Sequence, residues 1–492
     1  MMPMGSVTTK FVGSNTLRAD GVSAATTAVM AIAGSAPAYS IAAVSATLIA
    51  NAGLGSVAAL LWCAVPMLGI AWAFAYLGRA DASAGAAYSW VGRVLHPILG
   101  FFSGWALVVS ATIFMVAGTL PAGVASVSLF APDEVNNVPL VVAVGAAWFL
   151  AMAAFVLVGV RISARAQWIM TGIEVGILVV FAVVALVRGS AGNLAGATFS
   201  WNWFSLGSIS GGTGAFVAAA LIAAFYYWGW DVSANLSEET RNGRRNSGVA
   251  GIIGVVSVFV IFTVFTITIQ VVLPAEVIEQ HSGDILEVLG EAIWPGIGGK
   301  ILIMAVILST VASIETTLIQ VTRTLFAMGR DHTIPRAFGR THSKWQTPVV
   351  ATVAVTGICL VLFIGAAFFG SISEILSNMI SSIGLQISFY YSLAGAAVVV
   401  AYRHYIFTSV KNFIFIGLWP ALGAAFMLWV FCVSIPTLSP IVQVLGLGSL
   451  ALGIIPIAAY WKKGSRYFHR RTIDVATDSA ENPLDHEQSE FR

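Results

Sequence analysis

Four carboxylates lie within or at the edge of long apolar stretches, where a charge is costly. They are Glu174, Asp231, Glu315 and Glu374. Ionisable side chains at the depth of a bilayer are rare, and they are candidates for binding a cation or carrying a proton. At about 1.5 Å per helical residue, Glu174 lies about 13 Å beyond Arg165, and Asp231 about 10 Å before Glu238. We expect Glu374 to sit at the rim of its stretch and to be solvated.

Two of the apolar stretches are interrupted by residues that break helices. The first runs from about residue 21 to 50 and contains Gly34-Ser35-Ala36-Pro37. The sixth runs from about 213 to 236 and contains Tyr227-Trp228-Gly229-Trp230-Asp231. Inside a bilayer every backbone N–H and C=O needs a partner, so unwound backbone survives only where it lines a cavity or is buried in protein. Paired interruptions of this kind are typical of the binding site of a secondary transporter.

The two interruptions suit opposite ends of a small ligand. A helix that begins at Pro37 would present free N–H groups and a positive dipole end, for which a carboxylate is the natural ligand. Around Asp231, a carboxylate beside aromatic rings suits an amine. These aromatic residues are Phe225, Tyr226, Tyr227, Trp228 and Trp230, and we expect Tyr39 and Trp105 to approach them. The alternatives are that Pro37 only kinks a packed helix, that Asp231 only caps one, and that some of the rings are ordinary packing.

Glu174 and Glu315 are the candidates for proton coupling. Glu174 is flanked by apolar residues in an unbroken stretch, with no helix end to stabilise its charge, so burial favours its neutral form. This makes it the first choice. Glu315 lies close in sequence to five hydroxyl residues of its stretch and is the second choice, an interhelical hydrogen bond being its alternative role. These hydroxyl residues are Ser309, Thr310, Ser313, Thr316 and Thr317.

The elements that position these residues are predicted to be membrane-spanning helices. Of the 492 residues, 58% are hydrophobic and 9% are charged, whereas about a quarter would be charged in a soluble protein. Apolar runs long enough to cross a hydrocarbon core of about 30 Å recur along the chain. We count twelve, at roughly 22–50, 54–78, 95–129, 138–160, 165–187, 213–236, 248–273, 300–328, 349–369, 372–401, 413–433 and 440–461. The sequence therefore predicts an all-α membrane protein with twelve transmembrane helices.

The basic residues are distributed unevenly between the two sides of these spans. Of the 24 Lys and Arg residues, only Arg188 and Lys300 fall on one side, and that side carries most of the loop carboxylates. The positive-inside rule therefore places both termini in the cytoplasm of a multi-pass protein of the plasma membrane.

The two interrupted spans divide the chain into a predicted five-plus-five inverted repeat, because five is odd and the second set would start from the opposite face. We predict a cytoplasmic segment at 1–20 and a twelve-helix domain at 21–461. Within that domain, repeat one covers about 21–187, repeat two about 213–401, and helices 11 and 12 about 413–461. Residues 462–492 are predicted to be a disordered cytoplasmic tail, basic and then acidic.

The sequence offers no pattern typical of an enzyme or a metalloprotein. The seven histidines lie at span edges or in a loop, and Cys63, Cys359 and Cys432 are isolated within apolar spans. There is no H-E-x-x-H and no G-x-S-x-G. We expect no enzymatic activity, no metal, no cofactor and no nucleic-acid partner.

Four stretches of the chain resemble the amino acid–polyamine–organocation permeases. They are Gly34-Ser35-Ala36-Pro37; Ser83-Ala-Gly85-Ala-Ala-Tyr88 leading to Gly104-Trp105; Gly229-Trp230-Asp231 followed by Glu238-Glu239-Thr240-Arg241-Asn242; and Arg323-Thr-Leu-Phe-Ala-Met-Gly-Arg330-Asp331 continuing to Thr347-Pro348. Gly243 departs from the family, which usually places proline there. The resemblance implies the five-helix inverted repeat with two extra helices. It also implies that backbone from Gly34 to Pro37 binds a substrate carboxylate and that carbonyls near Trp228 and Gly229 bind its amine. Glu174 then occupies a position where sodium-coupled relatives bind the cation and some proton-coupled relatives carry a lysine.

The sequence therefore predicts a secondary active transporter that imports amino acids or related amines by alternating access, driven by protons. The alternatives are a polyamine or organic-amine permease, a sodium-coupled carrier and an amino acid exchanger. A channel or a permease-like sensor would be a different class; a channel would carry a ring of pore-lining residues, whereas this chain has a single asymmetric polar centre. The expected partners are the small-molecule substrate, a proton or sodium ion and membrane lipid, for a monomer or homodimer.

Overall fold

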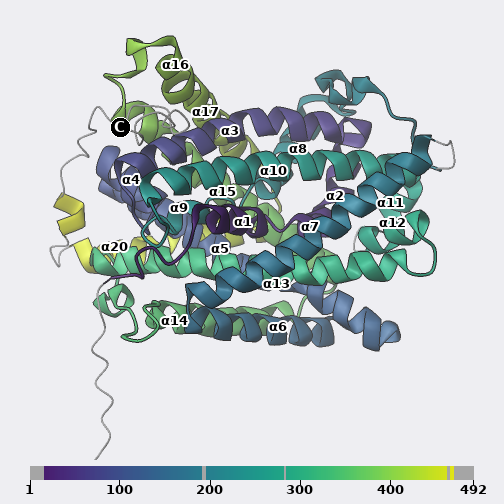
Figure 1. Ribbon diagram of the computed structural model, residues 1–492, viewed down its shortest axis with the longest axis horizontal. Helices are drawn as coiled ribbons and strands as arrows, with labels where there is room; N and C mark the ends of the chain where they lie inside the picture. The colour runs from purple at the N-terminus through teal and green to yellow at the C-terminus, as the bar shows by residue number, and fades with distance from the viewer. Residues whose placement is uncertain (1–15, 191–194, 282–283, 462–465, 470–492) are drawn as a thin grey trace, which may run out of the picture.

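The computed structural model describes residues 16–190, 195–281, 284–461 and 466–469, which are almost entirely helical. Figure 1 shows the long helices α3 (Ser56–Ala80), α10 (Gly243–Val272) and α13 (Gly298–Arg330) running roughly along the same direction, with α6 (Val138–Val158) beside α14 (Val349–Ala366) at one edge. Among the described residues there is no strand, and the isolated bridge between Val22 and Thr240 is the only β-type pairing.

The remaining α-helices alternate between long spans and short connecting pieces. They are α1 (Ala24–Gly34), α2 (Pro37–Ala52), α4 (Ala87–Val94), α5 (Pro97–Phe130), α7 (Val160–Ser190), α8 (Gly212–Tyr226), α9 (Val232–Asn235), α11 (Ala275–Gln280), α12 (Ile285–Ile293), α15 (Ile372–Ala401), α16 (Val410–Asn412), α17 (Trp419–Ser434), α18 (Pro440–Gln443), α19 (Ser449–Ala451) and α20 (Ile454–Trp461).

Short 3-10 or π-helical turns join or prolong these helices. They are η1 (Gly53–Gly55), η2 (Pro132–Glu134), η3 (Trp201–Phe204), η4 (Leu206–Ser208), η5 (Arg336–Gly339), η6 (Ile406–Thr408), η7 (Phe413–Leu418), η8 (Ile435–Thr437), η9 (Val444–Gly448) and η10 (Arg466–His469). Of these, η7 and η9 are π-helical and prolong the last two spans.

Ten helical runs in the described part of the chain are long and apolar enough to cross a membrane. The first is a run of 57 residues, Ala24–Ala80, which contains the turn η1. The helix α8 is apolar but has only 15 residues. The prediction of an all-α membrane protein is therefore confirmed.

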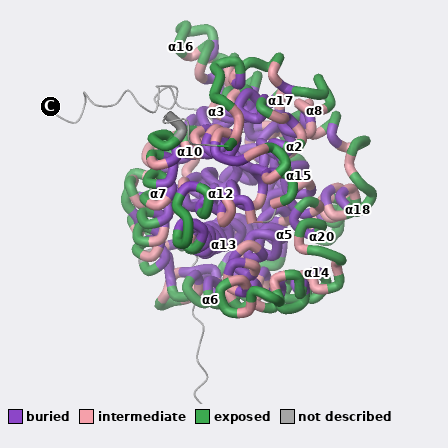
Figure 2. The backbone as a smooth tube through the Cα atoms, turned by 90° about the vertical axis from the view of Figure 1, so that its right-hand side faces the viewer, coloured by how far each residue is buried: buried purple, intermediate pink, exposed green. Residues whose placement is uncertain are grey.

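Burial divides the helices into a core and a periphery. In the most apolar segment of α13, 83% of the residues are buried, against 33% in α14. Figure 2, which looks along the bundle, shows buried backbone in the centre and exposed backbone around it. Many exposed side chains of α7 and α14 are large and apolar, for example Ile169, Val183 and Val361. Such a periphery suits contact with lipid chains rather than with water.

The two ends of the bundle carry opposite charge. The acidic end is marked by five carboxylates on α11, α12 and their flanks, namely Glu276, Glu279, Asp284, Glu287 and Glu291. The basic end is marked by Arg241, Arg244, Arg245, Arg330 and Arg336. The short helix α4 also lies at the basic end. At the acidic end, partial burial and repulsion from the nearby carboxylates of Asp284 and Glu291 raise the pKa of the Glu287 carboxyl.

The predicted tail and the predicted N-terminal segment lie largely outside the described residues. Within η10, the side chains of Tyr467 and Phe468 are buried. The Tyr467 hydroxyl donates to the Tyr88 carbonyl at 2.9 Å, and the two rings stack 4.7 Å apart. This part of the chain therefore packs against α4.

Candidate functional site

The first predicted interruption separates α1 from α2. The helix α1 ends at Gly34, and α2 begins at Pro37 after Ala36, whose φ of 49° is left-handed. Proline suits the first position of a helix because the N–H that it lacks would have no intrahelical partner there. A left-handed alanine costs about 1–3 kcal/mol of strain, and such strain concentrates at functional sites.

The second interruption separates α8 from α9 and crosses the first one. The helix α8 ends at Tyr226, α9 begins at Val232, and Gly229 between them has a φ of 95°. A Cβ placed on Gly34 would clash with the carbonyl oxygen of Gly229, and a Cβ on Gly229 would clash with that of Gly34. The two backbones therefore touch directly, and both positions require glycine.

Glu174 lies at the N-terminal end of α2. Its Oε1 accepts a hydrogen bond of 2.8 Å from the Ala38 N–H, and its side chain is fully buried. We expected Glu174 to have no helix end to stabilise its charge. That expectation is wrong, because α2, more than a hundred residues away in sequence, supplies the N-terminus that favours a negative charge.

The backbone N–H groups at the first break are not free in this conformation. Ser35 and Ala36 donate to the carbonyls of Ile32 and Ala33, at 3.1 and 3.0 Å. Tyr39 donates to Ser309 Oγ at 3.1 Å, and Ser40 to the Ala36 carbonyl. A substrate carboxylate would thus have to compete for these groups with acceptors of the protein itself.

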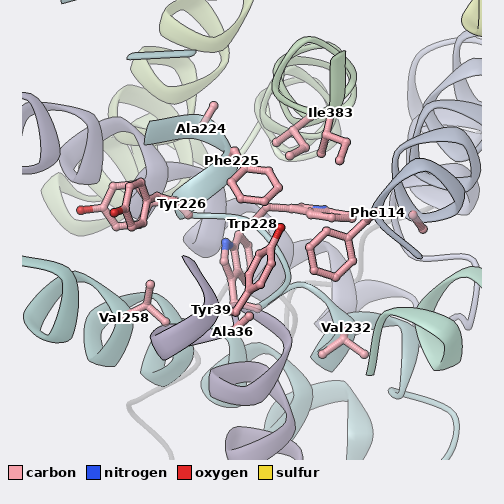
Figure 3. Close-up of a cluster of buried hydrophobic side chains, with 14 of the residues drawn as sticks. Ala36, Tyr39, Phe114, Ala224, Phe225, Tyr226, Trp228, Val232, Val258 and Ile383 are labelled. Atoms are coloured by element: carbon pink, nitrogen blue, oxygen red, sulfur yellow. The ribbon is translucent and has the colours of Figure 1, made fainter. Parts of the chain in front are cut away.

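An aromatic cluster packs beside the two breaks. Figure 3 shows Tyr39, Phe114, Phe225 and Trp228 turned toward one another, with Tyr226 directed to the other side. The Phe114 ring lies edge-on to Tyr39 at 5.6 Å and to Trp228 at 5.5 Å. Because these rings come from α2, α5, α8 and the second break, the cluster joins both halves of the chain.

Like Tyr226, the predicted aromatic residues Tyr227 and Trp105 point elsewhere. The Tyr227 hydroxyl donates to the Leu60 carbonyl on α3 at 3.0 Å. The Trp105 Nε1 donates to the Ser449 carbonyl at 3.0 Å, and its ring lies against Gly453. The structure therefore brings Tyr39, Phe225 and Trp228 together with the breaks, and places the rings of Tyr227 and Trp105 in other helix contacts.

Asp231 is linked to Trp228 of the aromatic cluster by hydrogen bonds through Tyr390. Its Oδ2 accepts from the Tyr390 hydroxyl at 2.8 Å, and that hydroxyl accepts from Trp228 Nε1 at 2.6 Å. The second oxygen, Oδ1, has no hydrogen-bond partner among the described residues. Asp231 stands at the N-cap of α9, but its side chain makes no capping hydrogen bond. The alternative that Asp231 only caps this helix is therefore wrong.

Glu315 is held between α7 and α13. Its Oε2 accepts from Gln167 Nε2 at 2.8 Å, and the same nitrogen donates to the Ala312 carbonyl at 2.8 Å. The side chain is buried. The interhelical hydrogen bond considered for Glu315 is thus present. Glu374, in contrast, is exposed in the first turn of α15, as expected.

A cavity of about 920 Å³ leads from the acidic end toward the breaks. Its lining includes Ala42, Leu221 and Ile380, each about one helical turn from Tyr39, Phe225 and Ile383 respectively. The aromatic cluster therefore forms the inner limit of this cavity, and the two breaks lie on the other side of the cluster, toward the basic end.

Ion pairs and hydrogen bonds close the basic end. Arg323 donates to both oxygens of Glu239 at 2.8 and 3.2 Å, and this pair is fully buried. Arg330 donates to both oxygens of Glu238 at 2.9 and 2.8 Å. Both pairs tie α13 to the segment that follows α9. In this conformation the site is approached from the acidic end and sealed at the basic end.

Several residues of the site were not identified from the sequence. Phe114, Tyr390 and the neighbouring Tyr391, whose ring packs against Tyr390, lie in otherwise regular spans, where a single aromatic residue carries no positional signal. In the sequence, Ser309 stands out only as one of the hydroxyl residues near Glu315. The adjacent pair Tyr390-Tyr391 could have drawn attention, because the other adjacent tyrosine pair, Tyr226-Tyr227, lies at the second interruption. Among the described residues, no group of three or more His, Cys, Asp or Glu is placed to hold a metal ion.

Comparison with known proteins identifies the family to which this geometry belongs. Residues 23–454 match the amino acid permease family. The vacuolar cationic amino acid transporter 2 of Arabidopsis thaliana is 24% identical over 332 residues, which are 65% of this chain and 50% of that protein. The low-affinity putrescine importer PlaP of Escherichia coli is 25% identical over 309 residues, 60% of this chain and 64% of that protein. The branched-chain amino acid permease BcaP of Bacillus subtilis is 24% identical over 345 residues, which are 67% of this chain and 68% of that protein.

The names of these three relatives all describe transport proteins, but they give different compounds. The chain spans half of the Arabidopsis protein and less than two thirds of PlaP. The match to the family, in contrast, covers nearly the whole helical bundle, including both breaks. This chain belongs to the amino acid permease family, within the amino acid–polyamine–organocation superfamily.

Proposed function

We propose that this protein is a secondary transporter that imports an amino acid or a related amine across the plasma membrane by alternating access. The observation that carries the proposal is the crossing of two interrupted helices beneath a cavity that is open at one end of the bundle and closed at the other. A substrate held at that crossing could be exposed to either side by movement of the helices around it. A channel would need a continuous pore, which the buried ion pair at the basic end does not favour.

We infer twelve spans in a five-plus-five inverted repeat plus two helices. At about 1.5 Å per residue, the run Ala24–Ala80 is about 85 Å long, too long for one crossing of a core of about 30 Å. It therefore counts as two spans that turn at η1, and α8 with α9 adds another to the ten runs. The proposed boundaries remain 21–187 and 213–401 for the repeats and 413–461 for the last two spans.

The same topology gives the proposed orientation, with the basic end and both termini in the cytoplasm. We expect a cysteine at Asp133 to react with an impermeant thiol reagent added outside intact cells, and a cysteine at Arg244 to remain unlabelled. Both side chains are exposed. The background should carry Cys432→Ser, since Cys432 is the exposed native cysteine whereas Cys63 and Cys359 are buried. The opposite labelling pattern would require the inverted orientation.

Two other positions, Gly283 and Gly243, are less suitable for this labelling. Gly283 lies outside the described residues. At Gly243, an added Cβ would clash with the Ser237 carbonyl, so a cysteine there would disturb the loop that it is meant to report on.

The substrate site is proposed to lie at the two breaks. Backbone from Gly34 through Ser35 and Ala36 to Pro37 would bind the carboxylate, and carbonyls near Trp228 and Gly229 would bind the amine. Tyr39, Phe225 and Trp228 would cover it on the side of the cavity. Asp231 would stabilise positive charge near the second break through the Tyr390 hydroxyl. A polyamine, which has no carboxylate, is the second candidate, because one relative is a putrescine importer.

Glu174 is proposed to couple transport to protons through the N-terminus of α2. As a carboxylate it occupies the positive end of α2 and holds the Ala38 N–H. Protonation removes that charge, and a hydrogen bond to a neutral acceptor is roughly half as strong as one to a charged acceptor. The end of α2 then becomes available to a substrate carboxylate, so the protonated protein binds substrate better. A sodium-coupled carrier and an exchanger are the alternatives.

Counterflow in proteoliposomes tests the function directly. We expect purified protein to exchange at least one of L-arginine, L-leucine and putrescine, the compounds suggested by the relatives, with saturation. Asp231→Asn should weaken binding of the cationic compounds by about 1–3 kcal/mol, the scale of a hydrogen bond to a charged group, and that of leucine less.

Asp133→Asn is the matched control, because Asp133 is exposed in η2 and lies away from the site. Equal affinities in wild type and Asp231→Asn would leave amine recognition to the backbone. Flux that rises linearly with concentration and shows no counterflow would contradict a carrier.

A further inference from the structure

The buried face of α7 changes from polar to apolar halfway along the helix. At four successive turns it carries Ser163, Gln167, Thr171 and Glu174, all buried. Beyond Glu174 the buried positions are Leu178, Phe181, Ala182 and Ala185. From Ser163 to Glu174 the polar part is about 16 Å long, at about 1.5 Å per residue. It therefore leads from the first break toward the basic end and does not continue toward the acidic end.

The helix α13 completes this polar surface from the opposite side. Ser309 lies at the N-terminus of α2, where it accepts the Tyr39 N–H. Glu315 follows about 9 Å further toward the basic end, at about 1.5 Å per residue. Gln167 joins Glu315 to the Ala312 carbonyl, so α7 and α13 are directly connected at this level. We call the six side chains Ser163, Gln167, Thr171, Glu174, Ser309 and Glu315 the polar stripe.

Most members of the polar stripe keep one polar atom unpaired. The buried atoms without a hydrogen-bond partner among the described residues are Ser163 Oγ, Gln167 Oε1, Thr171 Oγ1, Glu174 Oε2 and Glu315 Oε1. An unsatisfied buried polar atom costs about 1–3 kcal/mol, and such groups in a native structure call for an explanation such as bound water or a functional role. Five of them in one row, two of which belong to the carboxylates Glu174 and Glu315 themselves, provide donors and acceptors for a mobile proton.

The surroundings of the polar stripe contain few fixed charges. The helices α1, α2, α5, α6 and α14, which pack against α7 or α13, contain no Asp, Glu, Lys, Arg or His. On α13 the cation nearest in sequence to Glu315 is Arg323, which is paired with Glu239. The other charged residues of α7, α13 and the elements packed against them lie toward the two ends of the bundle. They are Arg161, Arg165, Arg188, Arg244, Arg245, Lys300, Arg330, Arg336, Glu287 and Glu291. Two more charged residues of these elements are Arg93, which is paired with Asp81, and Asp231, which lies at the second break.

We propose that Glu315 is a second proton-carrying carboxylate, which receives the proton from Glu174 and releases it at the basic end. In this step Glu174 changes from carboxylic acid to carboxylate as Glu315 changes from carboxylate to carboxylic acid. The hydroxyls of Thr171 and Ser163, with intervening water, each accept one proton and pass on another. Water at the basic end finally takes the proton from Glu315. Gln167 is a positioning residue, since an amide does not carry the proton but fixes Glu315 against α7.

The inference rests on the proposed proton coupling at Glu174 and adds a direction to it. Because the polar stripe ends at Glu174, the proton would enter Glu174 from the cavity together with the substrate, and leave through Glu315. The deprotonated Glu174 would then take back the Ala38 N–H and exclude a second substrate carboxylate.

Proton and substrate fluxes measured together test this route. Proteoliposomes loaded with a pH-sensitive dye would be given an inward proton gradient and whichever of L-arginine, L-leucine or putrescine shows counterflow. We expect Glu315→Gln to lose at least tenfold in gradient-driven accumulation and in proton flux, while substrate binding persists. Thr171→Val should slow proton-driven uptake several-fold. Thr352→Val on α14 is the matched control, because it removes a buried hydroxyl outside the polar stripe, and should transport like wild type.

Wild-type accumulation and wild-type proton flux in Glu315→Gln would overturn the proposal and leave Glu315 as a purely structural hydrogen bond. Should that variant fail to fold, Thr171→Val decides, and an unchanged rate there overturns the route as well. Counterflow by the wild-type protein without any response to a proton gradient would refute proton coupling itself, and the route with it, while the carrier function stands.

Discussion

Glu174→Gln should abolish uptake driven by a pH gradient while the protein still binds and exchanges substrate. Glutamine has nearly the same shape as protonated glutamic acid, and its amide oxygen can accept the Ala38 N–H bond that Glu174 Oε1 accepts at 2.8 Å. The variant would therefore resemble the protonated state permanently. Because no proton is gained or lost at this position, a pH gradient could no longer drive accumulation.

The measurement compares two activities of the same preparation. Counterflow at symmetric pH should remain, and accumulation under an inward proton gradient should fall to the level of empty liposomes. We also expect substrate affinity to become nearly independent of pH. Wild-type affinity should weaken as pH rises, because the carboxylate then occupies the N-terminus of α2.

Glu374→Gln is the matched control for this experiment. It makes the same chemical change at an exposed carboxylate in the first turn of α15, and it should accumulate substrate like wild type. If Glu174→Gln accumulates substrate as well as wild type does, coupling lies at another group.

Gly229→Ala should lower transport by at least tenfold. The residue has a φ of 95°, and an added Cβ would clash with the Gly34 carbonyl oxygen. A left-handed conformation costs a residue with a side chain about 1–2 kcal/mol, and relieving the clash would push the two breaks apart. The groups proposed to bind the two ends of the substrate would then no longer face one site.

Gly34→Ala should have a similar effect, because its added Cβ would clash with the Gly229 carbonyl oxygen. Gly34 itself is helical, so this effect comes from the clash and not from a left-handed backbone. Gly357→Ala is the control, since Gly357 lies in α14 and nothing is within 4 Å of an added Cβ. Size-exclusion chromatography and thermal unfolding of the purified variants show whether the loss arises in folding or in transport. Wild-type uptake by Gly229→Ala would mean that the close crossing is not needed.

The positions of the helix breaks could be predicted from the sequence because they depend on local chemistry. A single proline is not enough to interrupt a helix, because Pro66 and Pro121 lie inside α3 and α5. Clustered helix-breaking residues such as Gly34 with Pro37, however, disfavour a continuous helix locally, and both interruptions occur where the sequence placed them. The same holds for the membrane-spanning helices, whose length and composition follow from the thickness of the hydrocarbon core. That Glu174, Asp231 and Glu315 would be buried also followed, because each lies deep within an apolar stretch.

What surrounds each of these residues was decided only by the tertiary structure. Glu174 and Ala38 are separated by 136 positions, and Asp231 and Tyr390 by 159, so no local pattern connects them. The rotation of each helix about its axis is fixed by packing against its neighbours, which turns Trp105 toward Ser449 and Tyr227 toward Leu60 rather than toward the breaks. The charge of a buried carboxylate depends on which backbone N–H reaches it. For Glu174 that group belongs to another helix, and the fold alone brings the two together.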